Sequence, residues 1–328
     1  MSRTGFYKLF SVFLTSALLL AAFSSCSGKK SESDESETSA SASESTAESV
    51  INVSITPRSK EDYLNSSDIP EVKAAVAAKE SNMMDRPETI TINGVVIPTD
   101  TTSLTISKGG LENEDIVDLK YLINLRDLQI YENNISDLSP LQGLTKLTTL
   151  SVYKNNVSDL KPISGLVDLQ TLYLRDNDIS DITPLKNLVK MKNLDLSQNK
   201  IEDIRPLSEM KEITLLKLNN NNIKDLSPLG NMTGMDRIHL QNNEITDISP
   251  LLMMTDVTEI YIENNNVSNI SVISDMRELG WLKISGNPIE DITPLYNLVS
   301  LKKLWIEDIS GIDKDELQSA LPECLITY

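Results

Sequence analysis

Residues 125–144 read LRDLQIYENNISDLSPLQGL, and this stretch decides the fold because its pattern returns every 22 residues. The position that opens the pattern is apolar at each return, with no insertion between returns: Leu125, Leu147, Leu169, Met191, Ile213, Met235, Val257, Leu279 and Leu301. Eight full repeats therefore fill residues 125–300. Seven positions in each repeat are apolar throughout, 56 in all. Repetition at this period indicates stacked units that bury their apolar side chains against one another.

The spacing of these seven positions separates two architectures that share the period. On an α-helix they would be spread around the whole axis and form no apolar face, and the Asn-rich part of the repeat is a poor helix former. In a solenoid coil, Leu128 and Ile130 have the two-residue period of a strand. Leu138, Leu141 and Leu144 have the three-residue period of a 3₁₀ turn. The sequence therefore predicts coils with a strand on one side and short turns on the other.

An asparagine recurs once in every repeat, as regularly as the apolar residues. The column is Asn133, Asn155, Asn177, Asn199, Asn221, Asn243, Asn265 and Asn287. A side-chain amide has both donors and an acceptor, so we expect it to satisfy backbone groups in the turns of neighbouring coils.

An aspartate recurs four residues after this asparagine, except that Asn269 replaces it in the seventh repeat. A proline follows three residues later in seven repeats, and the Ser or Thr that usually precedes the proline is predicted to cap a short helical turn. Stacked carboxylates leave two interpretations open, namely hydrogen bonds from turn amides and bound calcium. We favour hydrogen bonds because no calcium-loop motif occurs.

The pattern LxxLxLxxNxIxDLSPLxxL of residues 125–144 resembles the leucine-rich repeats of the internalin type, and the resemblance covers about residues 125–306. It implies an α/β solenoid: a curved, right-handed superhelix with a parallel sheet on the concave side, short 3₁₀ or irregular segments on the convex side, and a cap at each end. It also implies a binding role and no catalysis, because members of this family are secreted or surface-attached bacterial proteins that hold other proteins on the concave face.

A solenoid exposes its core at both ends, so the flanking sequence should close it. We assign residues 51–124 to an N-terminal cap with a short helix over residues 68–80 that covers the end. A hairpin follows around Asn93-Gly94, a strong hairpin signal. An atypical first coil begins at Leu104, which lies 24 residues before Leu128.

The C-terminal cap is assigned to residues 301–328 as a partial repeat, a helix and a last strand. Asp313 is expected to cap the helix and Pro322 to end it, and Cys324 and Ile326 lie in the predicted strand. We interpret Cys324 as a small buried apolar residue, because no acid or histidine lies beside it in sequence.

The first 25 residues are predicted to be an export signal. Arg3 and Lys8 precede an apolar run over residues 9–23, which is shorter than the roughly 20 residues that span a bilayer. The run ends at Cys26 and resembles a bacterial lipobox, with Phe23 and Ser25 as departures from it. The resemblance implies a lipid on Cys26, and the alternative is a simply cleaved signal. Two acyl chains would suffice for stable anchoring.

Residues 26–50 are predicted to form a disordered tether, because they are rich in Ser and Glu and lack apolar periodicity. The net charge of −18 argues against nucleic-acid binding, and a single histidine argues against His-based catalysis. No nucleophile, phosphate-loop, metal or cofactor motif is present, so we predict a non-enzyme without a cofactor. The predicted location is the extracellular side of the bacterial cell membrane.

Outward-facing residues on the predicted concave sheet supply the candidate binding site, because they include both tryptophans of the chain. Rigid aromatic residues on a solvent-facing surface favour binding hot spots. The first predicted cluster is Tyr131, Tyr153, Tyr173 and Arg175. The second is Arg237, His239, Glu259, Tyr261, Trp281, Lys283 and Trp305. The aromatic side chains could instead only pack across coils, and His239 taken alone we interpret as a solvated surface residue. The expected partner is an extracellular protein, and the alternative is a glycan stacked on Trp and Tyr.

Overall fold

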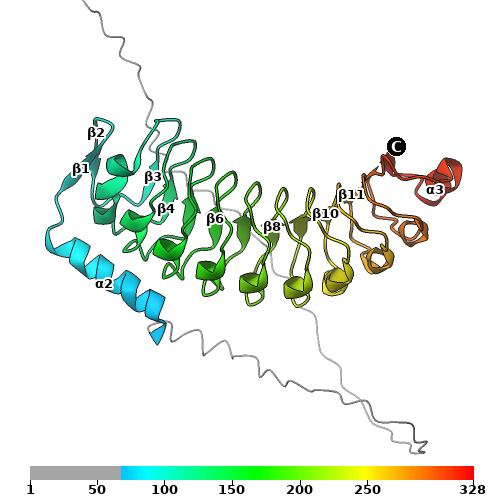
Figure 1. The fold of residues 1–328 in the computed structure, drawn as a ribbon, viewed down its shortest axis with the longest axis horizontal. Coiled ribbons are helices and arrows are strands. Elements are labelled where there is room, and N and C mark those ends of the chain that lie inside the picture. The colour runs from blue at the N-terminus through cyan, green and yellow to red at the C-terminus, as the bar shows by residue number, and fades with distance from the viewer. Residues whose placement is uncertain (1–67) are drawn as a thin grey trace, which may run out of the picture. The chain divides into compact units, whose positions relative to one another are not determined.

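A computed structural model describes residues 68–328. Its main feature is an eleven-stranded sheet in which neighbouring strands are parallel and follow one another in chain order (Figure 1). The strands are β3 (Ser103–Thr105), β4 (Asp127–Gln129), β5 (Thr149–Ser151), β6 (Thr171–Tyr173), β7 (Asn193–Asp195), β8 (Leu215–Lys217), β9 (Arg237–His239), β10 (Glu259–Tyr261), β11 (Trp281–Lys283), β12 (Lys303–Trp305) and β13 (Leu325–Thr327). The register from β4 to β12 advances by 22 residues per strand, so equivalent repeat positions stand side by side.

Short 3₁₀ helices return the chain on the side away from the strands (Figure 1). They are η2 (Asn113–Tyr121), η3 (Ser139–Leu141), η4 (Lys161–Ile163), η5 (Thr183–Leu185), η6 (Arg205–Leu207), η7 (Ser227–Leu229), η8 (Ser249–Met253), η9 (Ser271–Asp275) and η10 (Thr293–Leu295). The predicted leucine-rich repeat solenoid, with a parallel concave sheet and 3₁₀ turns on the convex side, is confirmed. The three-residue spacing of the apolar positions identified these turns correctly.

The core runs through the solenoid as one continuous cluster. All 56 periodic apolar positions are buried, and the most exposed of them, Ile292, has 9% of its surface exposed. Since burying a large aliphatic side chain contributes about 1.5–3 kcal/mol, this repetition is the main source of stability.

The asparagine column connects each coil to the one before it. In every repeat the side-chain oxygen accepts a backbone N–H of the preceding coil, as from Ile245 to Asn265 at 3.0 Å. The side-chain nitrogen of Asn265 donates to the carbonyls of Leu240 and Ile262 at 3.1 and 3.0 Å. The prediction that this column satisfies turn backbone groups is confirmed.

The aspartate column caps the 3₁₀ turns, and this corrects the prediction that the Ser or Thr before the proline supplies the cap. Asp137 accepts the backbone N–H of Ser139 at 2.8 Å and also its hydroxyl at 2.8 Å. The equivalent residue accepts the same N–H in each later repeat, including Asn269 in the seventh. These hydrogen bonds hold the pKa values of Asp181, Asp203 and Asp291 below the usual range.

The hairpin closes the N-terminal end of the core. Strands β1 (Thr89–Ile92) and β2 (Val95–Pro98) pair antiparallel around Asn93 and Gly94, both of which have positive φ. Ile90, Ile92 and Ile97 join the main core. Strand β3 then pairs with β4 and opens the atypical first coil as predicted.

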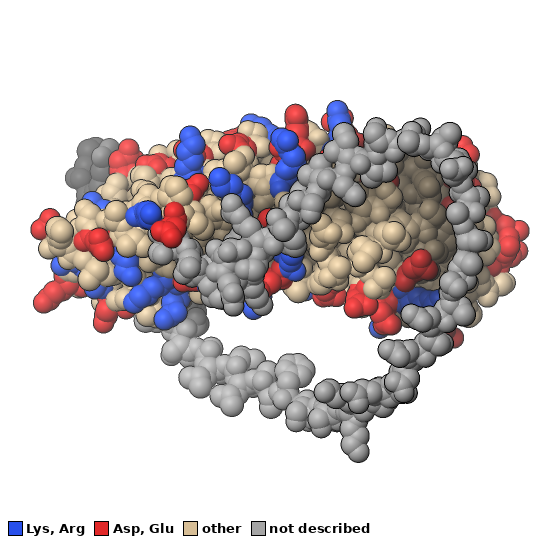
Figure 2. All heavy atoms as spheres, turned by 90° about the horizontal axis from the view of Figure 1, so that it is seen from below, with Lys and Arg blue, Asp and Glu red and all other residues tan. Residues whose placement is uncertain are grey.

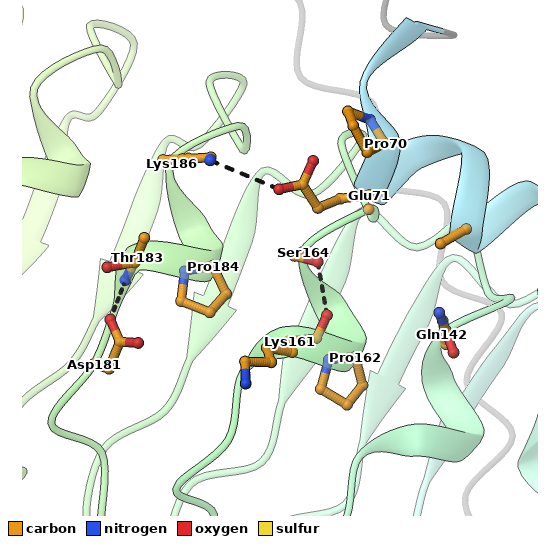
Figure 3. Close-up of a pocket in the computed structure, with 12 residues that line it drawn as sticks. Pro70, Glu71, Gln142, Lys161, Pro162, Ser164, Asp181, Thr183, Pro184 and Lys186 are labelled. Carbon is orange, nitrogen blue, oxygen red and sulfur yellow. Dashed lines mark hydrogen bonds and ion pairs between the residues drawn. The ribbon is translucent and has the colours of Figure 1, made fainter.

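Helix α2 (Pro70–Met84) forms where a helix was expected, but it does not cover the end of the solenoid. It lies along the convex turns of the first repeats (Figures 1 and 3), where Lys186 pairs with Glu71 at 3.7 Å. Glycines permit this approach, because a Cβ on Gly165 would lie 2.3 Å from the Glu71 carbonyl oxygen. A groove of about 510 Å³ follows the helix along these turns.

The C-terminal end is closed as the sequence predicts. Asp313 accepts the N–H groups of Asp315 and Glu316 at 3.1 and 3.0 Å and so caps α3 (Lys314–Ala320). Cys324 is buried and immediately precedes β13. Burial raises the pKa of its thiol to about 11, consistent with a small apolar residue.

Residues 1–67 lie outside the described part of the chain. The predicted export signal, the lipid on Cys26, the tether over residues 26–50 and the beginning of the N-terminal cap all fall there. Among the described residues, no helix has the length and apolar character needed to cross a membrane.

Candidate functional site

The outward positions of the strands form regular rows on the concave sheet. In each strand from β4 to β12 the middle residue is buried, and its two neighbours point to the other face of the sheet. Trp281 and Trp305 both lie on that outer face, and Trp281 has 37% of its surface exposed. The sequence prediction that the aromatic residues stand outside the core is confirmed.

The first predicted cluster is only partly brought together. The rings of Tyr131 and Tyr153 stack with centroids 4.5 Å apart and an interplanar angle of 10°. Burial, followed by the neighbouring Tyr131, raises the pKa of Tyr153. Tyr173 has no ring contact with this pair among the described residues, and Arg175 donates instead to the side chain of Gln198 at 2.6 Å. The core of the first cluster is therefore a tyrosine pair.

The second predicted cluster contains a continuous series of rings across β9, β10 and β12. His239 stacks on Tyr261 at 4.5 Å, and Tyr261 meets Trp305 edge to face at 6.2 Å. The ammonium group of Lys283 lies 4.5 Å from the ring centre of Tyr261 and 4.6 Å from that of Trp305. A cation between two aromatic faces is attracted by both, so Lys283 holds the two rings in place.

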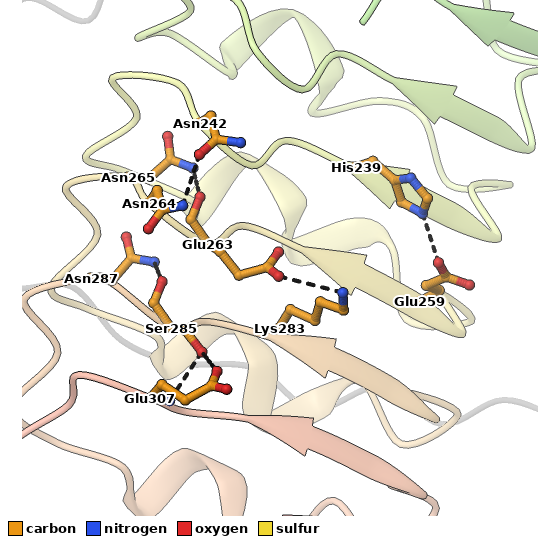
Figure 4. A network of polar contacts seen from close by, with 10 residues as sticks. All are labelled: His239, Asn242, Glu259, Glu263, Asn264, Asn265, Lys283, Ser285, Asn287 and Glu307. Atoms are coloured by element: carbon orange, nitrogen blue, oxygen red, sulfur yellow. Dashed lines mark hydrogen bonds and ion pairs between the residues drawn. The ribbon is translucent and has the colours of Figure 1, made fainter. Parts of the chain in front are cut away.

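Carboxylates complete this cluster and fix its charge state (Figure 4). Oε1 of Glu263 lies 3.6 Å from the Lys283 ammonium, while its Oε2 is buried without a hydrogen-bond partner. Burial raises the pKa of Glu263. Burial and then the Glu259 carboxylate raise the pKa of the Tyr261 hydroxyl to about 12, so this hydroxyl stays protonated at neutral pH.

His239 is not the solvated surface residue that we expected when it was considered alone. Its side chain is only 15% exposed, and its Nε2 lies 2.7 Å from Oε1 of Glu259. Burial lowers the pKa of the imidazole, although the Glu259 carboxylate acts against this shift. The ring stack with Tyr261 explains the burial, and no single-residue argument from sequence could show it.

Arg237 and Trp281 lie in the neighbouring row and do not join the ring series. Arg237 pairs with the adjacent Asp236 at 3.3 Å, and the ammonium of Lys302 lies 5.4 Å from the Trp281 ring centre. Sequence reasoning also missed Lys303, whose ammonium lies 4.3 Å from the Trp305 ring centre. The 22-residue register could have identified it, because Lys303 is paired with Trp281.

Cofactor and metal chemistry finds no set of residues among those described. Within residues 68–328, no group of three or more His, Cys, Asp or Glu side chains is arranged to hold a metal ion. The arrangement on β9–β12 offers ring faces, ammonium groups and hydrogen-bonding carboxylates, which are suited to binding a surface.

Comparison with known proteins identifies the repeats. The family model described as Leucine Rich repeats (2 copies) matches residues 123–165, 167–209 and 211–253. No curated protein matches the chain. An internalin (inlF) from Listeria monocytogenes is 26% identical to this chain, with a TM-score of 0.51, and the match covers 77% of this chain and 86% of that one.

Two further solved structures share the fold. An internalin C2 (inlC2) from Listeria monocytogenes is 28% identical with a TM-score of 0.51, and covers 71% of this chain and 90% of its own. The ectodomain of the plant receptor kinase GASSHO1/SCHENGEN3 from Arabidopsis thaliana, in complex with CASPARIAN STRIP INTEGRITY FACTOR 2, is 20% identical with a TM-score of 0.55, and the match covers 70% and 33%. The chain is therefore a leucine-rich repeat protein whose solenoid is similar to those of internalins.

Proposed function

We propose that the chain is a surface-anchored binding protein that holds a protein partner on its concave sheet. The ring series His239, Tyr261 and Trp305, with Lys283 between two of its rings, carries the proposal. Aromatic side chains held rigid on a surface lose little entropy on binding, which is why they dominate interface energetics. The similar receptor ectodomain solved with a bound factor supports this use of the fold.

The proposed binding residues are those of the two predicted clusters, extended by Lys303. The second cluster is the main one, because printed contacts join five of its members: His239, Glu259, Tyr261, Lys283 and Trp305. The tyrosine pair on β4 and β5 is a second contact region on the same face.

Export and lipid attachment at Cys26 complete the proposal and rest on the sequence alone. Labelling with a fatty-acid analogue tests the anchor. We expect the label in the wild-type chain and none in Cys26→Ala, and label retained by the variant would contradict lipidation.

Affinity measurements on single variants test the binding face and separate a protein from the alternative, a glycan. For a protein partner, we expect Trp305→Ala and Trp281→Ala to weaken binding, and Arg237→Ala and Glu259→Ala to weaken it as well. Sugar stacking would be lost with either tryptophan alone. Leu252→Ala is a matched control, since Leu252 is exposed on η8 at the convex side. Equal losses for Leu252→Ala and Trp305→Ala would contradict binding on the concave sheet.

A further inference from the structure

Charge is distributed unevenly along the concave sheet. The outward positions of β3–β7 include two aspartates, Asp127 and Asp195, and no lysine or arginine. The outward positions of β8–β12 include a single acid, Glu259, and four bases. The bases are Lys217, Arg237, Lys283 and Lys303. On a chain with a net charge of −18, this half of the sheet is an exception.

The acids around these bases leave part of the positive charge without a counterion. Glu259 is bonded to His239, Glu263 serves Lys283, and Arg237 pairs with an acid outside the row. Among the described residues, no carboxylate lies within 4.0 Å of the Lys217 or Lys303 ammonium group. By contrast, basic and acidic side chains are interspersed on the side shown in Figure 2.

From these contacts we infer that strands β8–β12 recognise an acidic, extended segment of the protein partner. The inference rests on the proposed function and adds the chemistry and direction of the ligand. Neighbouring strands lie about 4.8 Å apart, so four steps from β8 to β12 span about 19 Å, which is roughly six residues of extended peptide. Carboxylates along the segment would meet Lys217 and Lys303 near its two ends. The aspartates on β4 and β7 repel such a segment and so bias where it docks.

A display library of random peptides, selected on the full-length chain, is the probe. We expect the enriched peptides to carry a net negative charge and to lose affinity between about 0.1 and 1 M salt, where the screening length falls from about 10 to about 3 Å. The double variant Lys217→Glu and Lys303→Glu should weaken their binding roughly tenfold or more. Lys161→Glu is a charge-matched control, because Lys161 is exposed on convex turn η4.

The outcomes separate this inference from the proposed function. Enriched peptides that lose binding with Trp305→Ala but show no acidic excess, or are unaffected by the double variant, would overturn the acidic-segment inference and leave concave binding intact. Peptides unaffected by Trp305→Ala would contradict the proposed function itself. A sulfated oligosaccharide that competes with the peptides, binds more tightly and is lost with the double variant would show a polyanionic glycan site and also overturn the inference. Circular dichroism of each variant confirms that it is folded.

Discussion

Replacement of Asn265 by alanine should destabilise the solenoid strongly, because this side chain closes several backbone groups at once. The change leaves the buried N–H of Ile245 without an acceptor, which costs about 1–3 kcal/mol. The carbonyls of Leu240 and Ile262 lose one donor each but keep those of Asn243 and Asn287, so each loss costs about 0.5–1.5 kcal/mol. The expected total is about 2–6 kcal/mol, a large part of a typical stability of about 5–15 kcal/mol.

Denaturant unfolding followed by circular dichroism measures this loss, with Asn266→Ala as the control. Asn266 is the adjacent residue and is exposed, so its replacement should change the free energy of unfolding by about 0.5 kcal/mol or less. A repeat protein distributes stability over its coils, so the unfolding transition of Asn265→Ala should also broaden or split. Equal effects for the two variants would refute the assignment of the asparagine column as the connection between coils.

Three further predictions concern the convex helix, the histidine and the buried thiol. Gly165→Ala should displace α2, because the new Cβ would lie 2.3 Å from a backbone oxygen of the helix, and faster hydrogen exchange confined to α2 measures this. Gly234→Ala, with 4.0 Å of clearance, should leave exchange unchanged. Burial lowers the pKa of His239, so the unfolded chain takes up the proton first and stability falls as the pH drops through about 6.5. An NMR titration of this only histidine should give a midpoint below 6.5, and a midpoint at or above it would be contradictory. In a Cys26→Ala background, Cys324 should resist a thiol reagent at pH 8 until the chain is unfolded, because its pKa is raised to about 11.

The repeat architecture could be predicted from sequence because one physical rule applies to all eight coils. The period of 22 residues fixes the register of the sheet, and the alternation around Leu128 and Ile130 fixes which side chains face outward. The composition of each row on the concave sheet, including the placement of Trp281 and Trp305, follows without any knowledge of side-chain conformation.

The parts that could not be predicted depend on contacts outside the repeat. Nothing in the sequence of α2 shows which surface it covers. A signal did exist in the column that contains Gly143 and Gly165, because later repeats place larger residues there, beginning with Asn187. The position of Lys283 between two rings and the turn of Arg237 toward its own strand are choices among rotamers of long side chains, which the row pattern does not determine.

Photo-crosslinking from the two sides of the solenoid tests most directly whether partners bind the concave sheet. A benzophenone amino acid placed at Trp281 lies on the outer face of β11, and the same group at Leu252 lies on the convex turn η8. We predict that a partner is cross-linked from position 281 and not from position 252. Cross-linking from position 252, with none from position 281, would contradict binding on the concave sheet.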